Sequence, residues 1–363
     1  MTIRRKRRLG VPREDSGTSR NTRSRSAGRA KVPVQMNGDW GVAVDAAGTS
    51  TRQETAFRHQ QLLYATDDEY LAGTWRFVQD GLSSEDAILA VLPPDRQLLL
   101  KSALGSAAHR IQFSNMTAAG ANPNLVISIW RDFADHNARL GRSFRGIGEP
   151  AYPGRRPEEY AEVVLHESLC NLAFRQGPGW SLMCPYDIRE LQSDMVDAGR
   201  ATHPQLWNHV RTTTNQKYAG DAHAEMLMRA ELAPPVGLEI ALPVIDIRAT
   251  REAVSDLSTE AGMAPTQVEQ LALATHEVAA NAHRHGEPPP EASAWIDGRA
   301  VTVQIRGGGH FADPLAGRLR PNLTDGSGRG LWMANHLCDL VQVRNSSQGA
   351  IVRLICWLGG SHG

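Results

Sequence analysis

The chain has 363 residues, 41% of them hydrophobic and 21% charged, and its 39 basic side chains equal its 39 acidic ones. This composition is typical of a soluble globular protein, and the length suffices for two ordinary domains. No apolar run approaches the roughly 20 residues that span a bilayer, and the basic N-terminus lacks the apolar core of a secretory signal. The sequence therefore predicts a cytoplasmic protein without a membrane segment.

Residues 1–52 form a first segment, which is rich in Arg, Ser, Gly and Thr and shows no apolar periodicity. Its first 31 residues hold eleven Lys or Arg and two acids, a charge of +9 that leaves −9 for the rest of the chain. Such a segment cannot bury enough apolar surface to fold, so we expect a disordered basic tail. The charge asymmetry leaves open a second role, as an arm that contacts nucleic acid.

Residues 53–210 alternate between short apolar runs and segments of helical periodicity, a pattern typical of an α/β domain. The run 87–92 is continuously apolar and ends at two prolines, as expected of a buried parallel strand. Further short segments are expected at 62–65, 111–113, 125–129 and 180–184, and helices at 67–81, 97–104 and 157–174.

Residues 211–235 are polar and then Pro-rich, which predicts a linker with a connecting helix at 222–232. Residues 236–359 then predict an α+β sandwich, in which helices cover an antiparallel sheet. The expected strands are 238–242, 294–296, 301–305, 340–344 and 351–358, the expected helices are 249–261 and 266–285, and a hairpin turn is expected at 346–349.

The predicted helix 266–285 has a polar face beside its apolar stripe. Thr266 and Glu269 form a capping-box pattern at its start, and Gly286 follows its last turn. Glu277, Asn281 and His285 are spaced by four residues and therefore share one side of the helix. Such a face is ordinarily only solvent-exposed, and the helix alone leaves that alternative open.

A glycine-rich run, Gly326-Ser-Gly328-Arg329-Gly330-Leu331, leads into a second predicted helix. Glycines let the backbone approach a phosphate, and a helix N-terminus offers free N–H groups. No Gly-Lys-Ser/Thr follows, so the run is not a Walker loop. The four cysteines show no Cys-x-x-Cys spacing, which predicts neither a zinc site nor a disulfide framework.

The pattern Glu277-x-x-x-Asn281 with His285-Gly286, and the glycine-rich run, resemble the N box and the second glycine box of the GHKL ATPase fold. Within that fold they are most similar to bacterial serine kinases that act as anti-sigma factors. The resemblance implies a Bergerat-type sandwich that binds ATP and Mg²⁺, with Glu277 as catalytic base and Asn281 holding Mg²⁺ through the nucleotide. The ATP-binding residues it implies are Asn281, His285, Gly307, Gly309, Gly326, Gly328, Arg329, Gly330 and Leu331.

One position departs from the family pattern. The family places an Asp that accepts the adenine amino hydrogen bond after the strand 301–305, and this chain has Gly307 there. Losing one charge-assisted bond costs about 1.5–3 kcal/mol, or roughly one to two decades in affinity. Asp313 is too far along the chain to substitute without rearrangement, whereas Phe311 and His310 offer bulk that would fill the space.

A scattered series of residues in the first domain resembles the MEDS sensory domain of methylotroph and methanogen regulators. The series comprises His59, Tyr64, Phe77, Gly81-Leu82, Arg145 to Glu149, Glu167, Asn171, Cys184 to Asp187 and His203-Pro204. The resemblance implies a degenerate RecA-like fold, and the chain has no phosphate loop there. It also implies a sensory pocket for a small organic molecule, for which His59, Glu149, Asp187 and His203, with Cys184, are the candidate ligand or metal residues.

These resemblances imply a bacterial signalling regulator, whose sensory domain controls an anti-sigma-type serine/threonine kinase module. The implied partners are a sigma factor and a small STAS-domain antagonist that the kinase phosphorylates. Because of Gly307, the alternative is a non-catalytic anti-sigma or partner-binding protein with a degenerate ATP site. A homodimer is compatible with either alternative, and no membrane partner is expected.

Overall fold

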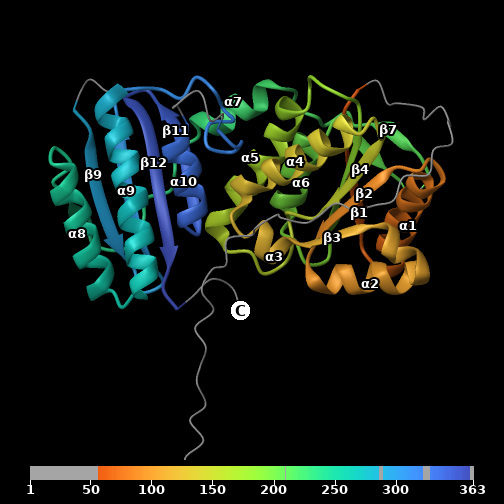
Figure 1. Cartoon of the computed structure of the whole chain (residues 1–363), viewed down its shortest axis with the longest axis horizontal. Coiled ribbons are helices and arrows are strands. Elements are labelled where there is room, and N and C mark those ends of the chain that lie inside the picture. The colour runs from red at the N-terminus through yellow and green to blue at the C-terminus, as the bar shows by residue number, and fades with distance from the viewer. Residues whose placement is uncertain (1–55, 209, 286–288, 322–327, 360–363) are drawn as a thin grey trace, which may run out of the picture. The chain divides into compact units, whose positions relative to one another are not determined.

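The computed structural model describes residues 56–208, 210–285, 289–321 and 328–359 (Figure 1). The predicted disordered tail, 1–52, and Gly326 of the glycine-rich run lie outside these residues. No helix among the described residues is long and apolar enough to cross a membrane.

The N-terminal half builds a sheet in the order β3-β2-β4-β5-β1-β6-β7, parallel throughout except for the β6–β7 pair. The strands are β1 (Arg58–Tyr64), β2 (Ala87–Leu92), β3 (Gln112–Asn115), β4 (Phe144–Gly148), β5 (Ser181–Asp187), β6 (Gln205–Trp207) and β7 (Thr212–Thr214). The helices are α1 (Asp67–Ser83), α2 (Pro94–Leu104), α3 (Met116–Ala119), α4 (Val126–Arg139), α5 (Pro157–Ala173) and α6 (Ser193–Thr202), with 3-10 turns η1 (Gly105–Arg110) and η2 (Pro123–Leu125).

Strands β1 and β5 lie side by side within this sheet, and their register decides which side chains meet. Gln61 lies opposite Cys184, and Tyr64 lies opposite Asp187. Because successive side chains of a strand alternate between faces, Cys184 and Asp187 point to opposite sides of the sheet. The Cys184 face packs in one core with residues of α4 and α5, and the opposite face packs with residues of α1 and α2.

The C-terminal half builds an antiparallel sheet in the order β11-β12-β10-β9-β8, with helices over one face (Figure 1). Its strands are β8 (Ile240–Ala241), β9 (Glu291–Ile296), β10 (Ala300–Gly307), β11 (Leu340–Ser346) and β12 (Gly349–Trp357), and its helices are α8 (Ile247–Glu260), α9 (Pro265–His285) and α10 (Arg329–Leu337). Helix α9 packs against α8, α10 and β10. Ser346 pairs with Gly349, which confirms the predicted hairpin.

Several elements differ from the sequence prediction, among them α6 and β6, which were not predicted. Residues 126–139 form helix α4, although 125–129 was expected as a short separate segment, because buried residues of α4 extend to Asn137 with helical spacing. Strand β4 was not predicted, since its two glycines weaken a strand pattern. Strand β8 covers only two residues of the expected strand 238–242. The predicted linker contains β7, which joins the N-terminal sheet, and α7 (Ala222–Arg229).

A buried polar network links helix α5 and turn η2 to the C-terminal half, and all of its residues belong to the compact unit 47–363. Glu162 of α5 accepts a 3.2 Å hydrogen bond from Nη2 of Arg318 and pairs at 2.6 Å with Nη2 of Arg344. Arg318 also donates to Asn124, whose Nδ2 donates to Oδ1 of Asn335 at 2.9 Å. Each of these side chains is nearly or fully buried, so none relies on water to satisfy its charge or dipole.

Candidate nucleotide site and sensory cluster

Helix α9 carries the two side chains predicted to act on a nucleotide. Glu277 and Asn281 are one turn apart, half-buried, and both reach the first turn of α10. A Cβ atom on Gly330 would lie only 2.7 Å from Nδ2 of Asn281 and 3.1 Å from Oε2 of Glu277. The structure therefore brings the two predicted boxes together, and a residue larger than glycine would displace both side-chain ends.

The start of α10 is built by the glycine-rich run. Gly328 precedes the helix with a φ of 82°, a left-handed conformation that favours glycine. Arg329 and Gly330 form the first turn, and the side chain of Leu331 is buried beneath it. The first N–H groups of a helix lack intrahelical partners, so this turn can receive an anion. Gly326 and the side chain of His285 lie outside what the structure describes.

The first glycine box lies at the end of β10, next to α9. A Cβ atom on Gly307 would lie 3.2 Å from the Cβ of Ala282, the residue after Asn281, so a side chain here would point at the N-box helix. The carbonyl of Gly309 accepts a 2.6 Å bond from the amide of Ala350, which continues the ladder beyond β10. The nearby Asp313 is exposed and accepts from the amide of Leu315.

His310 and Phe311 are held by the hairpin beside them. His310 is exposed, and its Nε2 donates to the carbonyl of Ser346 at 3.0 Å. Phe311 is half-buried, and its amide donates to Oδ1 of Asn345 at 2.9 Å. A surface depression at this end of the sheet is lined by 306–308 and His310 together with 241–246, and Glu277 and Asn281 are not among its lining residues.

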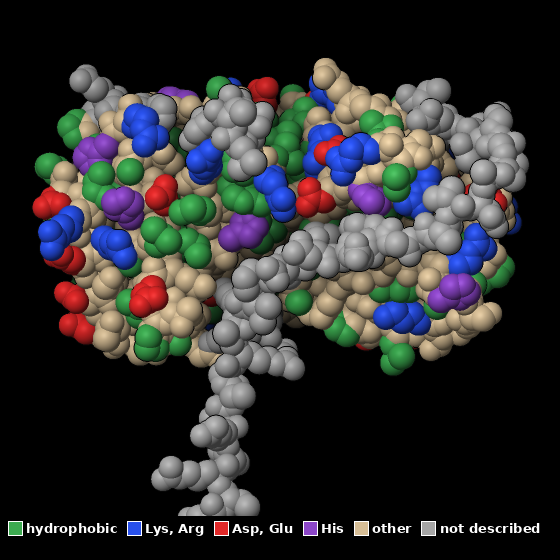
Figure 2. Space-filling model, in the orientation of Figure 1, with side chains coloured by type: hydrophobic (Ala, Val, Ile, Leu, Met, Phe, Trp, Pro, Cys, Tyr) green, Lys and Arg blue, Asp and Glu red, His purple; other side chains and the backbone are tan. Residues whose placement is uncertain are grey.

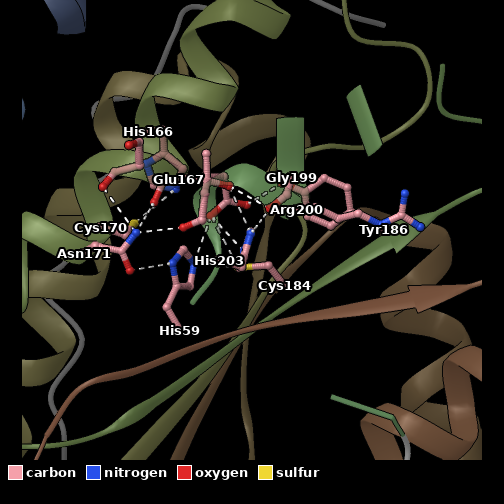
Figure 3. Close-up of polar contacts among 12 residues, drawn as sticks. His59, His166, Glu167, Cys170, Asn171, Cys184, Tyr186, Gly199, Arg200 and His203 are labelled. Atoms are coloured by element: carbon pink, nitrogen blue, oxygen red, sulfur yellow. Dashed lines mark hydrogen bonds and ion pairs between the residues drawn. The ribbon is translucent and has the colours of Figure 1, made fainter. Parts of the chain in front are cut away.

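The N-terminal sheet carries a second constellation, on the face that packs against α5 (Figure 3). The rings of His59 of β1 and His203 after α6 lie with their centroids 4.0 Å apart, tilted by 39°. Nε2 of His59 lies 3.0 Å from Oε2 of Glu167, and Nε2 of His203 lies 3.6 Å from the same oxygen. Sγ of Cys184 lies 3.4 Å from Nε2 of His59 and 3.5 Å from Oε2 of Glu167.

Glu149 and Asp187, the other two candidate pocket residues, bond elsewhere. Glu149 accepts a 2.8 Å bond from the hydroxyl of Tyr64, and Asp187 accepts from Arg96 at 3.0 Å and from Arg189 at 2.8 Å. The reason is the period of two along a strand: an odd separation puts Asp187 on the face opposite Cys184 and Tyr64 on the face opposite His59. The four candidates therefore divide between two faces of the sheet.

Two family models match the chain over these same elements. Residues 58–204 match the MEDS domain, described as the methanogen/methylotroph DcmR sensory domain. Residues 241–356 match the histidine kinase-like ATPase domain. The chain is a MEDS domain followed by a histidine kinase-like ATPase domain. A comparison with curated proteins gives no match. A sensory domain fused to such an ATPase domain is the architecture of a signalling regulator.

Burial controls the charge of the titratable groups in the MEDS domain. It raises the pKa of Glu149 to about 8, although the hydrogen bond from Tyr64 and the charge of Arg96 both oppose that rise. Burial also opposes ionisation of Asp187, but the hydrogen bonds from Arg189 outweigh it and hold its pKa below the usual value. Glu149 and Asp187, two of the candidate pocket residues, thus have pKa values that are shifted in opposite directions.

Glu167 is the member of the sensory cluster that sequence reasoning did not select as a pocket residue. It belongs to the MEDS-like series, and so does its neighbour Asn171, which contacts His59. The sequence signal that could have identified Glu167 and Asn171 as partners is their spacing of four on the helix 157–173, which puts both side chains on one face. The pairing of that face with β1 and β5 is non-local and could not be taken from the helix alone.

Proposed function

We propose that the MEDS domain controls an ATP-dependent protein serine/threonine kinase module of the anti-sigma-factor type. The convergence of Glu277 and Asn281 on Gly330 supports this proposal most directly, because it keeps two polar side chains beside the N-terminus of α10. The oxygen of Asn281 suits Mg²⁺ on the nucleotide phosphates, and Glu277 is placed to accept the proton of an attacking serine hydroxyl. Bound ATP would supply the phosphoryl group.

The partners follow from the same proposal. A sigma factor would be bound, and a small STAS-domain antagonist would present the serine that is phosphorylated. A small organic molecule would be the signal for the MEDS domain, whose parallel sheet we take to be a degenerate RecA-like fold. Nη1 of Arg284 donates to Oδ1 of Asn281 at 3.1 Å, so this contact would have to break for Oδ1 to bind the cation.

Gly307 favours a second candidate function, a partner-binding module that does not use ATP. Glycine offers no acceptor to the adenine amino group, and a site built around one hydrogen bond loses discrimination when that group is absent. Under this alternative the ATPase domain binds its protein partner equally well with and without ATP. Both candidates predict a folded domain, so the discriminating quantity is the affinity for the nucleotide.

Isothermal titration with ATP and Mg²⁺ tests the proposal on the whole chain. We expect measurable binding to the wild type and none to Asn281→Ala, because that variant removes the oxygen that holds Mg²⁺. Arg251→Ala, an exposed change on α8, serves as the control and should bind like the wild type. Equal ATP affinity in the wild type and in Asn281→Ala would show that the nucleotide site lies elsewhere.

Gly307→Asp separates the two candidate functions. A Cβ at this position meets the Cβ of Ala282 at 3.2 Å, so α9 has to shift by a few tenths of an ångström to admit the side chain. If the site is a kinase site that lacks one carboxylate, the variant should bind ATP roughly tenfold or more tightly than the wild type, and should prefer adenine over guanine nucleotides. No change in affinity, or loss of stability from an unpaired buried charge, would favour the module that does not use ATP.

A further inference from the structure

Four chemically different donor atoms converge inside the MEDS domain. They are Nε2 of His59, Oε2 of Glu167, Sγ of Cys184 and Nε2 of His203, and all lie within 4.8 Å of one another. The four side chains come from β1, α5, β5 and the residue after α6, and each is at most 1% exposed (Figure 3). The nucleotide chemistry proposed for the ATPase domain uses none of them.

The outer hydrogen bonds of the two imidazoles direct their lone pairs inward. Asn171 donates through Nδ2 to the carbonyl of Thr202 at 2.8 Å, so its Oδ1 is the acceptor that faces Nδ1 of His59 at 3.2 Å. Nδ1 of His203 lies 2.7 Å from the carbonyl of Gly199, which can only accept. Both Nδ1 atoms therefore carry the proton, and both Nε2 atoms present a lone pair to the cluster.

In this arrangement several hydrogen-bond acceptors face one another. Two imidazole lone pairs and a carboxylate oxygen point at one another, and Nε2 of His203 has no hydrogen-bond partner although it is buried. The thiol of Cys184 donates its proton to Oε2 of Glu167, and a proton on Glu167 can serve only one of the two rings, whereas a metal cation satisfies all four donor atoms together.

Three of the donor separations have the spacing of a tetrahedral site. Metal–ligand bonds of about 2.0–2.3 Å to nitrogen, oxygen and sulfur place neighbouring donors about 3.4–3.6 Å apart in a tetrahedron. Of the six donor pairs, three have this spacing: Glu167 to His203 at 3.6 Å, and Cys184 to His59 and to Glu167 at 3.4 Å and 3.5 Å. The pair of His59 and Glu167 is closer, at 3.0 Å, and the remaining two pairs lie within 4.8 Å. A thiolate and a carboxylate also neutralise a divalent cation, which makes the loaded site compatible with full burial.

We propose that His59, Glu167, Cys184 and His203 form a closed four-ligand site for Zn²⁺ in the MEDS domain. Mixed nitrogen, oxygen and sulfur ligands in tetrahedral array are characteristic of this ion, and four protein ligands leave no open coordination position. The site ties α5 to β1 and β5, so it fixes the helix that also carries Glu162. The sequence shows no Cys-x-x-Cys spacing for this site, because its four ligands come from four separate parts of the chain.

The test uses the full chain. The wild type, purified without chelator, should contain one Zn²⁺ per chain by elemental analysis. After removal of the metal, titration with Co²⁺ should produce the visible ligand-field bands of a tetrahedral complex and a near-ultraviolet thiolate-to-cobalt charge-transfer band. Because the ion binds the folded state, reloading should also raise the melting temperature of the chain.

Cys184→Ser and Cys170→Ser form a matched pair of variants. Both cysteines are fully buried, and Cys170 belongs to an overlapping three-donor group with His166 and Glu167. The proposal requires that Cys184→Ser loses the charge-transfer band and that Cys170→Ser retains it. A wild type that takes up neither Zn²⁺ nor Co²⁺ overturns the proposal even if both variants misfold. Loss of the band in Cys170→Ser alone would place the ion in the other group and overturn the assignment.

Discussion

Glu149 is a single carboxyl group whose charge state depends on pH within an accessible range. It is fully buried beside the hydroxyl of Tyr64, one of its oxygens has no hydrogen-bond partner, and burial raises its pKa to about 8 from 4.5. Between these two pH values the folded chain keeps a proton that the unfolded chain has released. The contribution of Glu149 to stability is therefore fully present below about pH 4.5 and is lost as pH rises toward 8.

Glu149→Gln should remove this pH dependence. The amide keeps an oxygen that can accept from Tyr64, but it carries no titrating proton. We expect the free energy of unfolding of the variant, minus that of the wild type, to grow by up to about 1.4 kcal/mol per pH unit between roughly pH 5 and 8. Urea denaturation at several pH values measures it, with the exposed Glu190→Gln as control. Parallel curves for Glu149→Gln and the wild type would contradict the assignment.

At the scale of one element, helix α5 connects the sensory cluster with the ATPase domain. Glu162 binds Arg318 and Arg344 of the ATPase domain, and Glu167, little more than one turn further on, lies 3.0 Å and 3.6 Å from the two histidines of the sensory cluster. A helix turn is stiff over this distance, since each residue adds about 1.5 Å along the axis. A change at the cluster that moves α5 would therefore also move Glu162 against the two arginines.

Glu162→Gln should be strongly destabilising. Removing the carboxylate leaves two guanidinium groups, each at most 5% exposed, without their compensating charge. Breaking a buried pair by removal of one partner typically costs about 3–5 kcal/mol. Glu158→Gln on the same helix is the matched control, because its pair with Arg299 is solvent-exposed and such pairs contribute at most about 1 kcal/mol. Equal melting temperatures for the two variants would show that the network adds little stability.

The sequence predicted the bounds of α5 almost to the residue, as 157–174 against Pro157–Ala173, but none of its polar contacts. Helix bounds depend on local signals, such as the proline at the first position and the apolar spacing that follows. The partners of Glu162 lie 156 or more residues away. Such contacts depend on how the two halves pack, which periodicity does not encode.

The two candidate sites also differ in how much of each could be predicted from the sequence. Glu277, Asn281 and Gly330 lie close together, and this proximity was expected from the resemblance of two motifs to the GHKL boxes, not from the helix pattern alone. The sensory pocket was only half anticipated: His59 and His203 meet, but Glu149 and Asp187 bond to other residues. Strand register separates them, and register is set by pairing between β1 and β5, which no single segment specifies.

At the scale of the whole molecule, charge is distributed unevenly along the chain. The first 31 residues carry +9 and the remainder carries −9. On the face shown in Figure 2, acidic and basic side chains of the described residues are interspersed rather than gathered into one area. An anionic partner of the basic segment would therefore find no equally concentrated positive charge on that face. This asymmetry is what supports a nucleic-acid contact through the tail.

The basic tail leads to a prediction about how nucleic-acid affinity depends on salt concentration. Arg4, Arg5, Lys6, Arg7 and Arg8 form an uninterrupted basic run. If the tail binds nucleic acid through phosphates, each of these contacts should contribute about −0.9 to the slope of log affinity against log salt concentration on duplex DNA. A full-length variant with these five residues changed to Gln should thus lose about 4 to 5 from that slope.

Fluorescence anisotropy with a labelled duplex, measured across a salt series, gives the slope of log affinity against log salt concentration for the wild type and for the Gln variant. The melting temperature of the Gln variant serves as the control. It should stay within about a degree or two of the wild type, because surface substitutions usually change stability by less than about 0.5 kcal/mol. A wild-type chain that fails to bind the duplex at low salt removes the nucleic-acid role of the tail. A large drop in melting temperature would instead show that the basic run packs against the folded body.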